Sequence, residues 1–264
     1  MAEIVVGTSG FSYEDWVGPV YPQRTAKKDF LGIYASEFSL VELNFSYYRQ
    51  PEPWVLERML NNTPESFQFA IKAHQSLTHV VDENFAQNLS TYKERIAPLI
   101  DSSRLAAVLF QFPYSFHYTP PSRKHLKTIC SAFADLPAAV EFRNNEWLKE
   151  SVYKGLKEYN MALVNVDEPQ LPKLPRPGHT VTADLSYVRF HGRNKKEWWT
   201  GDNISRYDYL YSREELEGWL PLIRVIAKQV KLLLITFNNH RRGQAVQNAR
   251  QMKQLLLLEE QSQP

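Results

Sequence analysis

Short runs of aliphatic and β-branched residues alternate along the chain with stretches of helical periodicity. They recur at a mean spacing of roughly 30 residues, which is the rhythm of repeated strand–helix units in a parallel sheet. Several are apolar for at least four consecutive residues, as in LAAVLF and VKLLLITF, which is typical of strands covered on both faces. The runs begin near Ile4, Leu40, Phe67, Leu105, Ala138, Met161, Ser186 and Val230.

Amphipathic patterns between these runs predict the helices that would cover the sheet. They span residues 26–38, 53–64, 82–100, 122–136, 150–160, 212–229 and 243–260. In the last of them Ala245, Ala249 and Met252 lie on one stripe, which should pack on the strands. Ser212 and Glu215 fit a capping box. Together these patterns predict an α/β fold, a single (β/α)8 TIM-barrel-like domain over residues 1–264.

Polar residues stand at or just after the ends of the predicted strands. A (β/α)8 barrel places its chemistry there, so we expect these side chains to converge on one concave, charged site. Residues two apart on a strand share a face, and three pairs should therefore face the interior together. The pairs are Glu42 with Asn44, Glu141 with Arg143, and Arg189 with His191; the other candidates are Lys72, Gln111, Asp167, Asn238 and Asn239.

Composition places the chain among ordinary globular proteins and limits its partners. The 264 residues are 43% hydrophobic and 23% charged, with a formal net charge of +2. This charge is too small to indicate nucleic-acid binding by itself, so any basic function must come from local placement of Lys and Arg. Cys130 lies between apolar neighbours in a predicted helix and is expected to be a buried structural thiol.

The sequence shows neither the pattern of a signal peptide nor that of a membrane-spanning helix. Its first residues, MAEIVVGTSG, lack a basic region followed by an apolar run. No stretch of about 18 apolar residues occurs anywhere. We therefore expect a cytoplasmic protein without membrane association.

Two predicted connections are irregular. Residues 171–181 contain three prolines and a glycine and should form a rigid loop. Residues 192–212 combine bases with Trp and Tyr, and a loop of this length and aromatic content is expected to be functional rather than disordered. Trp199 in this loop and Trp16 after the first strand are candidate ligand-stacking residues. The alternative is that each packs within the protein.

Several ordered motifs together resemble the DUF72, or YecE-like, proteins. They are GTSGFSYEDWVGPVYP, VELNFSYYRQP, FAIKAHQSLTH, LFQFP, AVEFRN, YVRFHGR and FNNHRRGQAVQNA. The resemblance runs nearly end to end and implies a TIM-barrel-like fold, related in architecture to the endonuclease IV and xylose isomerase group. It also implies that the strand-end residues named above match the family's recurrent polar positions. The chain departs at Phe11, where tryptophan is common, and at Asn144, where many members have histidine.

Glu42 and Glu141 form a pair of carboxylates that could perform acid–base chemistry. Lys72 and His191 are the other candidate catalytic groups. Burying charges without a task is costly, which favours function over a purely structural role. In the structural alternative, Glu141 forms a buried ion pair with Arg143. The candidate ligand-binding residues are Asn44, Gln111, Arg143, Asp167, Arg189, Asn238, Asn239, Trp16 and Trp199.

The loop after the last predicted strand is expected to hold an anion. Asn238 and Asn239 precede the sequence RRG at 241–243, where a helix is predicted to begin. Loops after the seventh and eighth strands that end in a helix N-terminus are the usual phosphate site of this fold. The nearby pair Arg189 and His191 would also suit a phosphate group.

These features predict a barrel that binds an anionic, phosphorylated ligand containing a ring, or nucleic acid, at its C-terminal face. Hydrolysis is the default chemistry. One alternative is a non-catalytic nucleic-acid or ligand-binding protein, and another is a metal-dependent enzyme resembling a sugar isomerase. A bound metal is the weaker interpretation, because the chain lacks HExxH and a cysteine pair. We therefore assign no metal ligands, and the cofactor and oligomeric state stay open.

Overall fold

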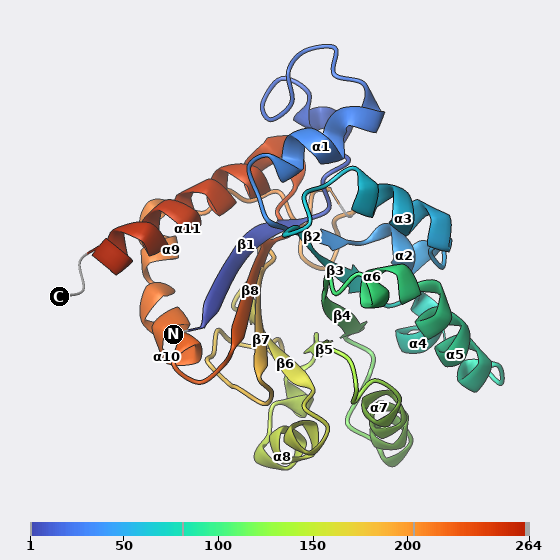
Figure 1. The fold of residues 1–264 in the computed structure, drawn as a ribbon. Helices are drawn as coiled ribbons and strands as arrows, with labels where there is room; N and C mark the ends of the chain where they lie inside the picture. The colour runs from blue at the N-terminus through green and yellow to red at the C-terminus, as the bar shows by residue number, and fades with distance from the viewer. Residues whose placement is uncertain (1, 81, 203, 262–264) are drawn as a thin grey trace.

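The eight predicted strands form a closed parallel barrel in a computed structural model that describes residues 2–80, 82–202 and 204–261 (Figure 1). Strands adjacent in sequence are adjacent in the barrel, and β1 pairs with β8 to close it. Each strand begins within two residues of its predicted start. The strands are β1 Glu3–Ser9, β2 Leu40–Leu43, β3 Gln68–Lys72, β4 Leu105–Phe112, β5 Ala138–Phe142, β6 Ala162–Asp167, β7 Leu185–Phe190 and β8 Leu232–Phe237.

Helices cover the outside of the barrel except between β6 and β7, where residues 168–184 form the predicted proline-rich loop. They are α1 Phe30–Ala35, α2 Phe45–Tyr48, α3 Pro53–Asn61, α4 Gln75–Thr78, α5 Phe85–Arg95, α6 Ala97–Asp101, α7 Pro120–Ala132, α8 Glu150–Glu158, α9 Arg213–Glu217, α10 Leu220–Ala227 and α11 Gln244–Gln261. Short 3-10 turns are η1 Glu14–Trp16, η2 Lys27–Asp29, η3 Asn145–Trp147 and η4 Arg241–Gly243.

Two of the predicted helices are each divided in two. Residues 82–100 form α5 and α6, and residues 212–229 form α9 and α10. Pro98 and Pro221 lie in the first turns of α6 and α10. A proline has no N–H to donate to the preceding turn, so a new helix starts where one continuous helix was predicted.

Local signals read from the sequence are confirmed elsewhere. Ser212 accepts a hydrogen bond from the Glu215 N–H, and the Glu215 carboxylate accepts one from the Ser212 N–H, completing the capping box of α9. Ala245 and Met252 of α11 are fully buried. Cys130 is buried in α7, and this burial raises the pKa of its thiol to about 12. No helix among the described residues is long and apolar enough to cross a membrane.

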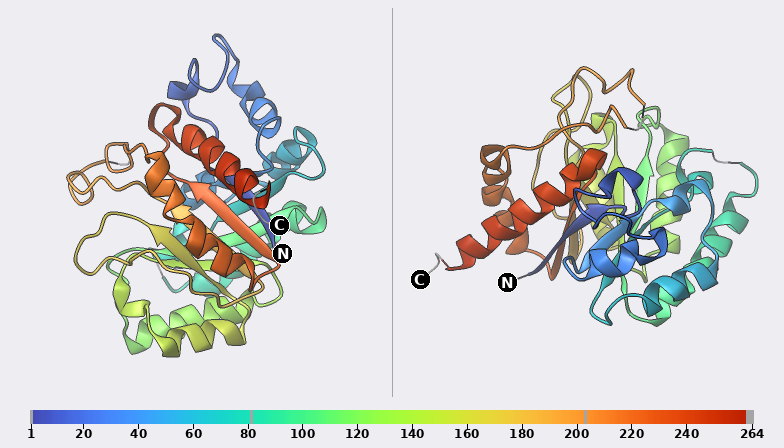
Figure 2. Two further views of the ribbon diagram at one scale, coloured as in Figure 1. Left: turned by 90° about the vertical axis from the view of Figure 1, so that its left-hand side faces the viewer. Right: turned by 90° about the horizontal axis from the view of Figure 1, so that it is seen from above.

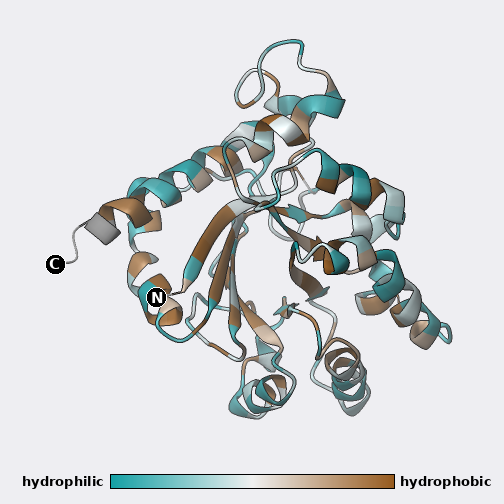
Figure 3. Ribbon diagram, in the orientation of Figure 1, coloured by the Kyte–Doolittle hydropathy of each residue, from teal (hydrophilic) through white to brown (hydrophobic). Residues whose placement is uncertain are grey.

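The barrel interior changes from apolar to polar along the strands. Leu40, Leu109 and Leu234 pack together in one buried cluster near the amino ends. Two residues further along two of these strands lie Glu42 and Gln111. Figure 3 shows mainly hydrophobic strands surrounded by helices with mixed surfaces. The loops after β6 and β7 project from the end of the barrel opposite to the chain termini (Figure 2, left). The polar end of the barrel is therefore the end that these loops surround.

Candidate functional site

A buried ion cluster lies under the carboxyl end of the barrel, and Arg189 of β7 is at its centre. Arg189 donates to both carboxylate oxygens of Glu42, from Nε (2.8 Å) and Nη2 (2.5 Å). Its Nη1 donates to Oε2 of Glu141 (2.5 Å). The hydroxyl of Tyr187 donates to the same Glu42 carboxylate (2.5 Å). All four side chains are at most 2% exposed, so the cluster is a fixed part of the structure.

Arg143, which follows β5, extends this cluster toward the open end. Its Nε contacts Glu141 Oε1 at 2.7 Å without hydrogen-bond geometry, and its Nη1 donates to Glu168 Oε2 (3.1 Å). His191 lies between Arg143 and Glu141. Its Nδ1 faces Nη2 of Arg143 (3.3 Å) and the amide nitrogen of Asn238 (3.2 Å), while its Nε2 lies 3.2 Å from Glu141. Both neighbours of Nδ1 are donors, so Nδ1 accepts and Nε2 carries the proton.

The protonation states follow from burial and from these contacts. Burial acts to raise the pKa values of Glu42 and Glu141, but the charge of Arg189 together with the neighbouring hydrogen bonds and, at Glu141, the charge of Arg143 outweighs it and lowers both pKa values. Burial, together with the charge of Arg143, lowers the pKa of His191 to about 3. Burial raises the pKa of Glu168 to about 8. Near neutral pH the cluster therefore holds two carboxylates against two arginines, with His191 neutral and Glu168 mainly protonated.

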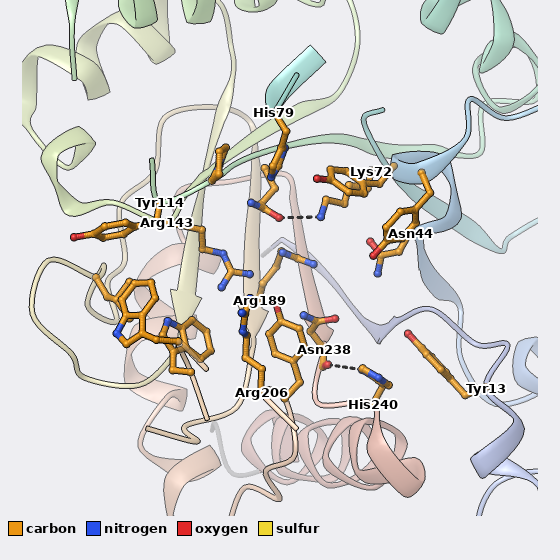
Figure 4. Close-up of a pocket in the computed structure, with 18 residues that line it drawn as sticks. Tyr13, Asn44, Lys72, His79, Tyr114, Arg143, Arg189, Arg206, Asn238 and His240 are labelled. Atoms are coloured by element: carbon orange, nitrogen blue, oxygen red, sulfur yellow. Dashed lines mark hydrogen bonds between the residues drawn. The ribbon is translucent and has the colours of Figure 1, made fainter. Parts of the chain in front are cut away.

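A pocket of about 580 Å³ opens above the cluster at the carboxyl end of the barrel (Figure 4). Four bases line it, and no Asp or Glu is among the described residues that do so. The bases are Lys72, Arg143, Arg189 and Arg206. The amides are Asn44, Gln111 and Asn238, and the aromatic residues are Tyr13, Tyr47, Tyr48, Tyr114, Trp198, Trp199 and Tyr207; His79, His240, Pro113 and Leu174 complete the wall.

Lys72 approaches the centre of the pocket from the end of β3 (Figure 4). Its amine donates to Oε1 of Gln111 (2.8 Å) and lies 4.3 Å from the ring centroid of Tyr47. Burial and the positive charge of Arg189 lower the pKa of Lys72 to about 7. Lys72 therefore exchanges a proton near neutral pH, which Arg143 and Arg189 do not.

The segment 192–212 after β7 forms one wall of the pocket. Trp198 is 3% exposed, and its ring centroid lies 5.5 Å from the guanidinium carbon of Arg143. Trp199 is 52% exposed and contacts Tyr114 edge to face. Tyr207 lies 6.0 Å from the ring of His191. The loop predicted to be functional is thus ordered around the pocket where the structure describes it.

The structure brings together seven of the predicted site residues at the pocket surface. They are Lys72, Asn44, Gln111, Arg143, Arg189, Asn238 and Trp199. Glu42, Glu141 and His191 lie directly beneath, fully buried and paired with the arginines. The three same-face pairs inferred from strand alternation are therefore found as predicted, but the carboxylates do not face the cavity.

After strand β6, the polar residue that faces the barrel interior lies one position later than predicted. Val164 and Val166 pack inside the barrel, so Glu168 continues the inward face while Asp167 points outward. Asp167 accepts from the indole of Trp219 (2.6 Å) and pairs with Arg193 (2.6 Å), away from the pocket. Asp167 was therefore predicted on the wrong face, and Glu168 was missed.

Trp16 and Asn239 also lie outside the pocket lining. Trp16 is fully buried, and its indole donates to the His240 carbonyl (2.6 Å). The Asn239 amide donates to the carbonyl of Tyr209 (2.8 Å) and to Asn248 (2.8 Å). Asn239 directly follows the inward-facing Asn238 and points the other way, whereas Trp16 lies in the η1 turn, where its indole packs into the core.

The anion site expected at the RRG sequence is filled by the protein's own carboxylates. Asp208 pairs with Arg241 and accepts from the Gln244 side chain at the start of α11. Asp15 accepts from the Arg242 N–H (2.7 Å). The cationic surface open to a ligand lies instead over β3, β5 and β7.

Several lining residues carried weak signals in the sequence. Tyr47 and Tyr48 in VELNFSYY belong to the aromatic residues expected at this face of the barrel, and Tyr114, two residues after β4, could have been found by extending the strand-end search into the loops. Arg206 could not, because it lies in the middle of a long loop whose path is not encoded by periodicity. Its Nε has no hydrogen-bond partner among the described residues.

The described part of the chain holds no group of three or more His, Cys, Asp or Glu side chains arranged to bind a metal. The carboxylates under the pocket bind arginines instead. Asn144, where a histidine is common in the resembling family, caps η3 by accepting from the Glu146 N–H (3.0 Å).

The fold and site define a (β/α)8-barrel protein with a positively charged, aromatic-walled pocket at the carboxyl ends of its strands. The chain belongs to the family described as "Protein of unknown function DUF72", whose model matches residues 5–264. This confirms the resemblance inferred from the motifs.

Similar proteins span almost the whole chain. The UPF0759 protein YunF of Bacillus subtilis is 33% identical, over 97% of this chain and 95% of that protein. The crystal structure of a DUF72 family protein from Thermotoga maritima matches with a TM-score of 0.89 and 39% identity, over 96% of this chain and 99% of that one. One from Enterococcus faecalis matches with a TM-score of 0.83 and 32% identity, over 96% and 95%.

Proposed function

We propose that this barrel binds an anionic, phosphorylated ligand that contains a ring, in the pocket at its C-terminal face. The observation that carries the proposal is the charge of the pocket wall. Lys72, Arg143, Arg189 and Arg206 line the cavity, and no carboxylate is among the described lining residues; Glu42 and Glu141, which pair with Arg189 and Arg143, lie beneath it. Phosphate oxygens are the acceptors that such a group of donors suits best.

The arginines are held ready for a ligand. Arg189 and Arg143 are fixed from below by Glu42 and Glu141, so little side-chain entropy is lost on binding. Arg206 keeps a buried Nε without a partner, and Asn44 keeps a buried Oδ1 without one. Buried polar atoms of this kind are costly unless a ligand or water satisfies them. They supply a donor and an acceptor for ligand hydroxyl or phosphate groups.

The aromatic side chains favour a ring in the same ligand. Trp199 and Tyr114 meet edge to face at 5.0 Å at one side of the pocket, and Trp199 is half exposed. Tyr48 is 64% exposed at another side. Exposed aromatic faces beside bases are the combination that stacks nucleobases or sugar rings.

Hydrolysis is the reaction we propose for this ligand. Lys72 is the lining residue that could move a proton near neutral pH, since burial and Arg189 lower its pKa to about 7. Glu42 and Glu141 would act as positioning residues, because their oxygens are bonded to arginines below the cavity. His191 would likewise position Arg143.

Calorimetric titration with three related probes tests the binding proposal. Adenosine 5′-monophosphate should bind more tightly than ribose 5-phosphate, which lacks the base, and much more tightly than adenosine, which lacks the phosphate. Arg206→Gln and Lys72→Met should each weaken binding of the monophosphate roughly 10- to 100-fold, as expected for one charge-assisted hydrogen bond. The matched control Arg58→Gln, on the exposed side of α3, should bind like the wild type. Equal affinity for adenosine and its monophosphate would contradict the proposal.

A second candidate is a non-catalytic nucleic-acid binder, which the exposed Trp199 and Tyr48 favour. It predicts that single-stranded oligonucleotides bind with an affinity that falls steeply with salt, and that Trp199→Ala weakens binding by about 1–3 kcal/mol. Turnover of a bound oligonucleotide that disappears in Lys72→Met would exclude the non-catalytic version.

A further inference from the structure

The amine of Lys72 differs from the two central arginines in its partners. Arg143 and Arg189 are each paired with buried carboxylates. Lys72 instead has the neutral oxygen of Gln111 at 2.8 Å and the face of Tyr47 at 4.3 Å, and it forms no ion pair among the described residues. Figure 4 shows its side chain directed into the pocket.

These surroundings make a neutral amine accessible under physiological conditions. Removal from water disfavours the ammonium form, and the positive charges of Arg189 and Arg143 add to this effect, so that the pKa of Lys72 falls to about 7. A desolvated lysine next to other cations is the arrangement that activates an amine as a nucleophile. The charged or titratable groups that face it are Arg189, Glu141, Arg143, Glu42, His79 and Tyr47.

We propose that Lys72 forms a Schiff base with a phosphorylated aldehyde or ketone whose phosphate group is bound by the pocket arginines. This inference rests on the proposed anion binding, and it names the reactive group of the ligand. It does not require the hydrolytic step. An arginine cannot do this chemistry, because a guanidinium stays charged and is not nucleophilic at physiological pH.

The step is balanced without a cofactor or an oxidant. The neutral Nζ attacks the carbonyl carbon, a C–N bond forms, and the carbonyl oxygen takes a proton to give a carbinolamine. The nitrogen loses one proton to water, and the hydroxyl group takes one and leaves as water. The nitrogen lone pair forms the C=N bond, which leaves a protonated imine on Lys72. The net reaction consumes one carbonyl, one amine and one proton, and releases one water.

Trapping with pyridoxal 5′-phosphate and sodium borohydride tests the inference. This probe carries an aldehyde, an aromatic ring and a phosphate, and borohydride reduces an imine to a stable secondary amine that peptide mass spectrometry locates. Lys72 should be labelled at least about tenfold faster than any other lysine, because an amine in water without such neighbours is almost fully protonated at neutral pH. The labelling rate should rise to half its maximum near pH 7.

Two controls connect the labelling to the pocket. Pyridoxal, which lacks the phosphate, should label Lys72 at least tenfold more slowly than its phosphate ester, and inorganic phosphate should compete with the ester. Lys72→Arg should abolish the preferential label, and Lys28→Arg on the exposed η2 turn should leave both the label on Lys72 and the binding of adenosine 5′-monophosphate unchanged.

The outcomes separate this inference from the proposed function. Binding of pyridoxal 5′-phosphate, seen by calorimetry, without a reduced adduct on Lys72 would overturn the Schiff base and leave the anion site intact. Neither binding nor adduct would overturn both. Labelling of Lys72 that is equally fast with pyridoxal would keep the nucleophile but refute the phosphorylated substrate class. If Lys72→Arg does not fold, peptide mapping of the wild type decides alone.

Discussion

Arg189 on β7 joins carboxylates from two other, non-adjacent strands of the barrel, Glu42 on β2 and Glu141 on β5. It is itself 2% exposed, so neither charge can be screened by water when the partner is lost. Glu42 and Glu141, which the sequence suggests as catalytic acids, therefore mainly fix the positions of Arg189 and Arg143. This is why the pocket above them has a positive rather than a negative surface.

Replacing Arg189 should be among the most damaging changes in the protein. Arg189→Met leaves the buried Glu42 without a cationic partner and Glu141 with Arg143 alone, and it should lower the free energy of unfolding by about 3–5 kcal/mol at neutral pH. Urea denaturation measures this, and the loss should shrink as the pH falls toward about 4.5, because burial without Arg189 raises the pKa of the unpaired acid and it takes up a proton above that value. Arg58→Met on the surface should change stability by less than about 0.5 kcal/mol. A small effect for Arg189→Met would show that water reaches the cluster.

His191 and Glu168 should give the folded protein opposite pH dependences. The folded pKa of His191, about 3, lies below its ordinary 6.5, so the unfolded state binds more protons between these values and stability rises with pH. The folded pKa of Glu168, about 8, lies above 4.5, so the folded state binds more protons and stability falls with pH over that window. The two effects oppose each other between pH 4.5 and 6.5.

Replacing either residue alone should reveal how the other makes the free energy of unfolding depend on pH. Relative to the wild type, His191→Gln should make stability fall with pH between 4.5 and 6.5, by up to about 1.4 kcal/mol per pH unit. Glu168→Gln should make it rise by a similar amount. Urea unfolding at a series of pH values measures both, and slopes of the same sign in the two variants would refute the assignment.

At the scale of elements, strand periodicity was enough to predict where the eight strands begin, because each apolar run had to be buried on both faces. The same alternation explains the success of the pairs such as Arg189 with His191. At the end of β6, a shift of one residue decides whether Asp167 or Glu168 faces the barrel interior, and the sequence pattern does not locate the strand end to within one residue. The loop residues Arg206 and Tyr207 were beyond prediction because tertiary contacts, rather than a repeating pattern, set the path of segment 192–212.

Within that segment, two neighbouring tryptophans should behave differently. Trp198 is 3% exposed under Arg143, so Trp198→Ala should cost about 3–5 kcal/mol of stability. Trp199 is 52% exposed, and Trp199→Ala should change stability by less than about 1 kcal/mol. Thermal or urea unfolding compares them directly. Equal losses would mean that the loop packs in solution with both indoles covered.

For the whole molecule, closure of the barrel depends on a glycine in β1. Gly7 pairs with Leu40 of β2 and Thr236 of β8, and a β-carbon at this position would overlap the Leu40 carbonyl oxygen. Gly7→Ala should therefore lower the free energy of unfolding by about 1–3 kcal/mol, through strain in the strand pairing. Gly155→Ala on α8 is the matched control, since no atom lies within 4 Å of its added carbon. That change should stabilise the protein by about 0.5–1 kcal/mol. Differential scanning calorimetry of the two variants would test both signs.

The loops at the two ends of the chain are joined to each other at the pocket. The Trp16 indole donates to the His240 carbonyl (2.6 Å), Asp15 accepts from the Arg242 N–H (2.7 Å), and Tyr13 stacks on His240 at 4.6 Å. During synthesis the first of these loops leaves the ribosome more than two hundred residues before its partner. The nascent chain therefore cannot complete this wall of the pocket, and ligand binding should begin only once the last strand has been made and inserted.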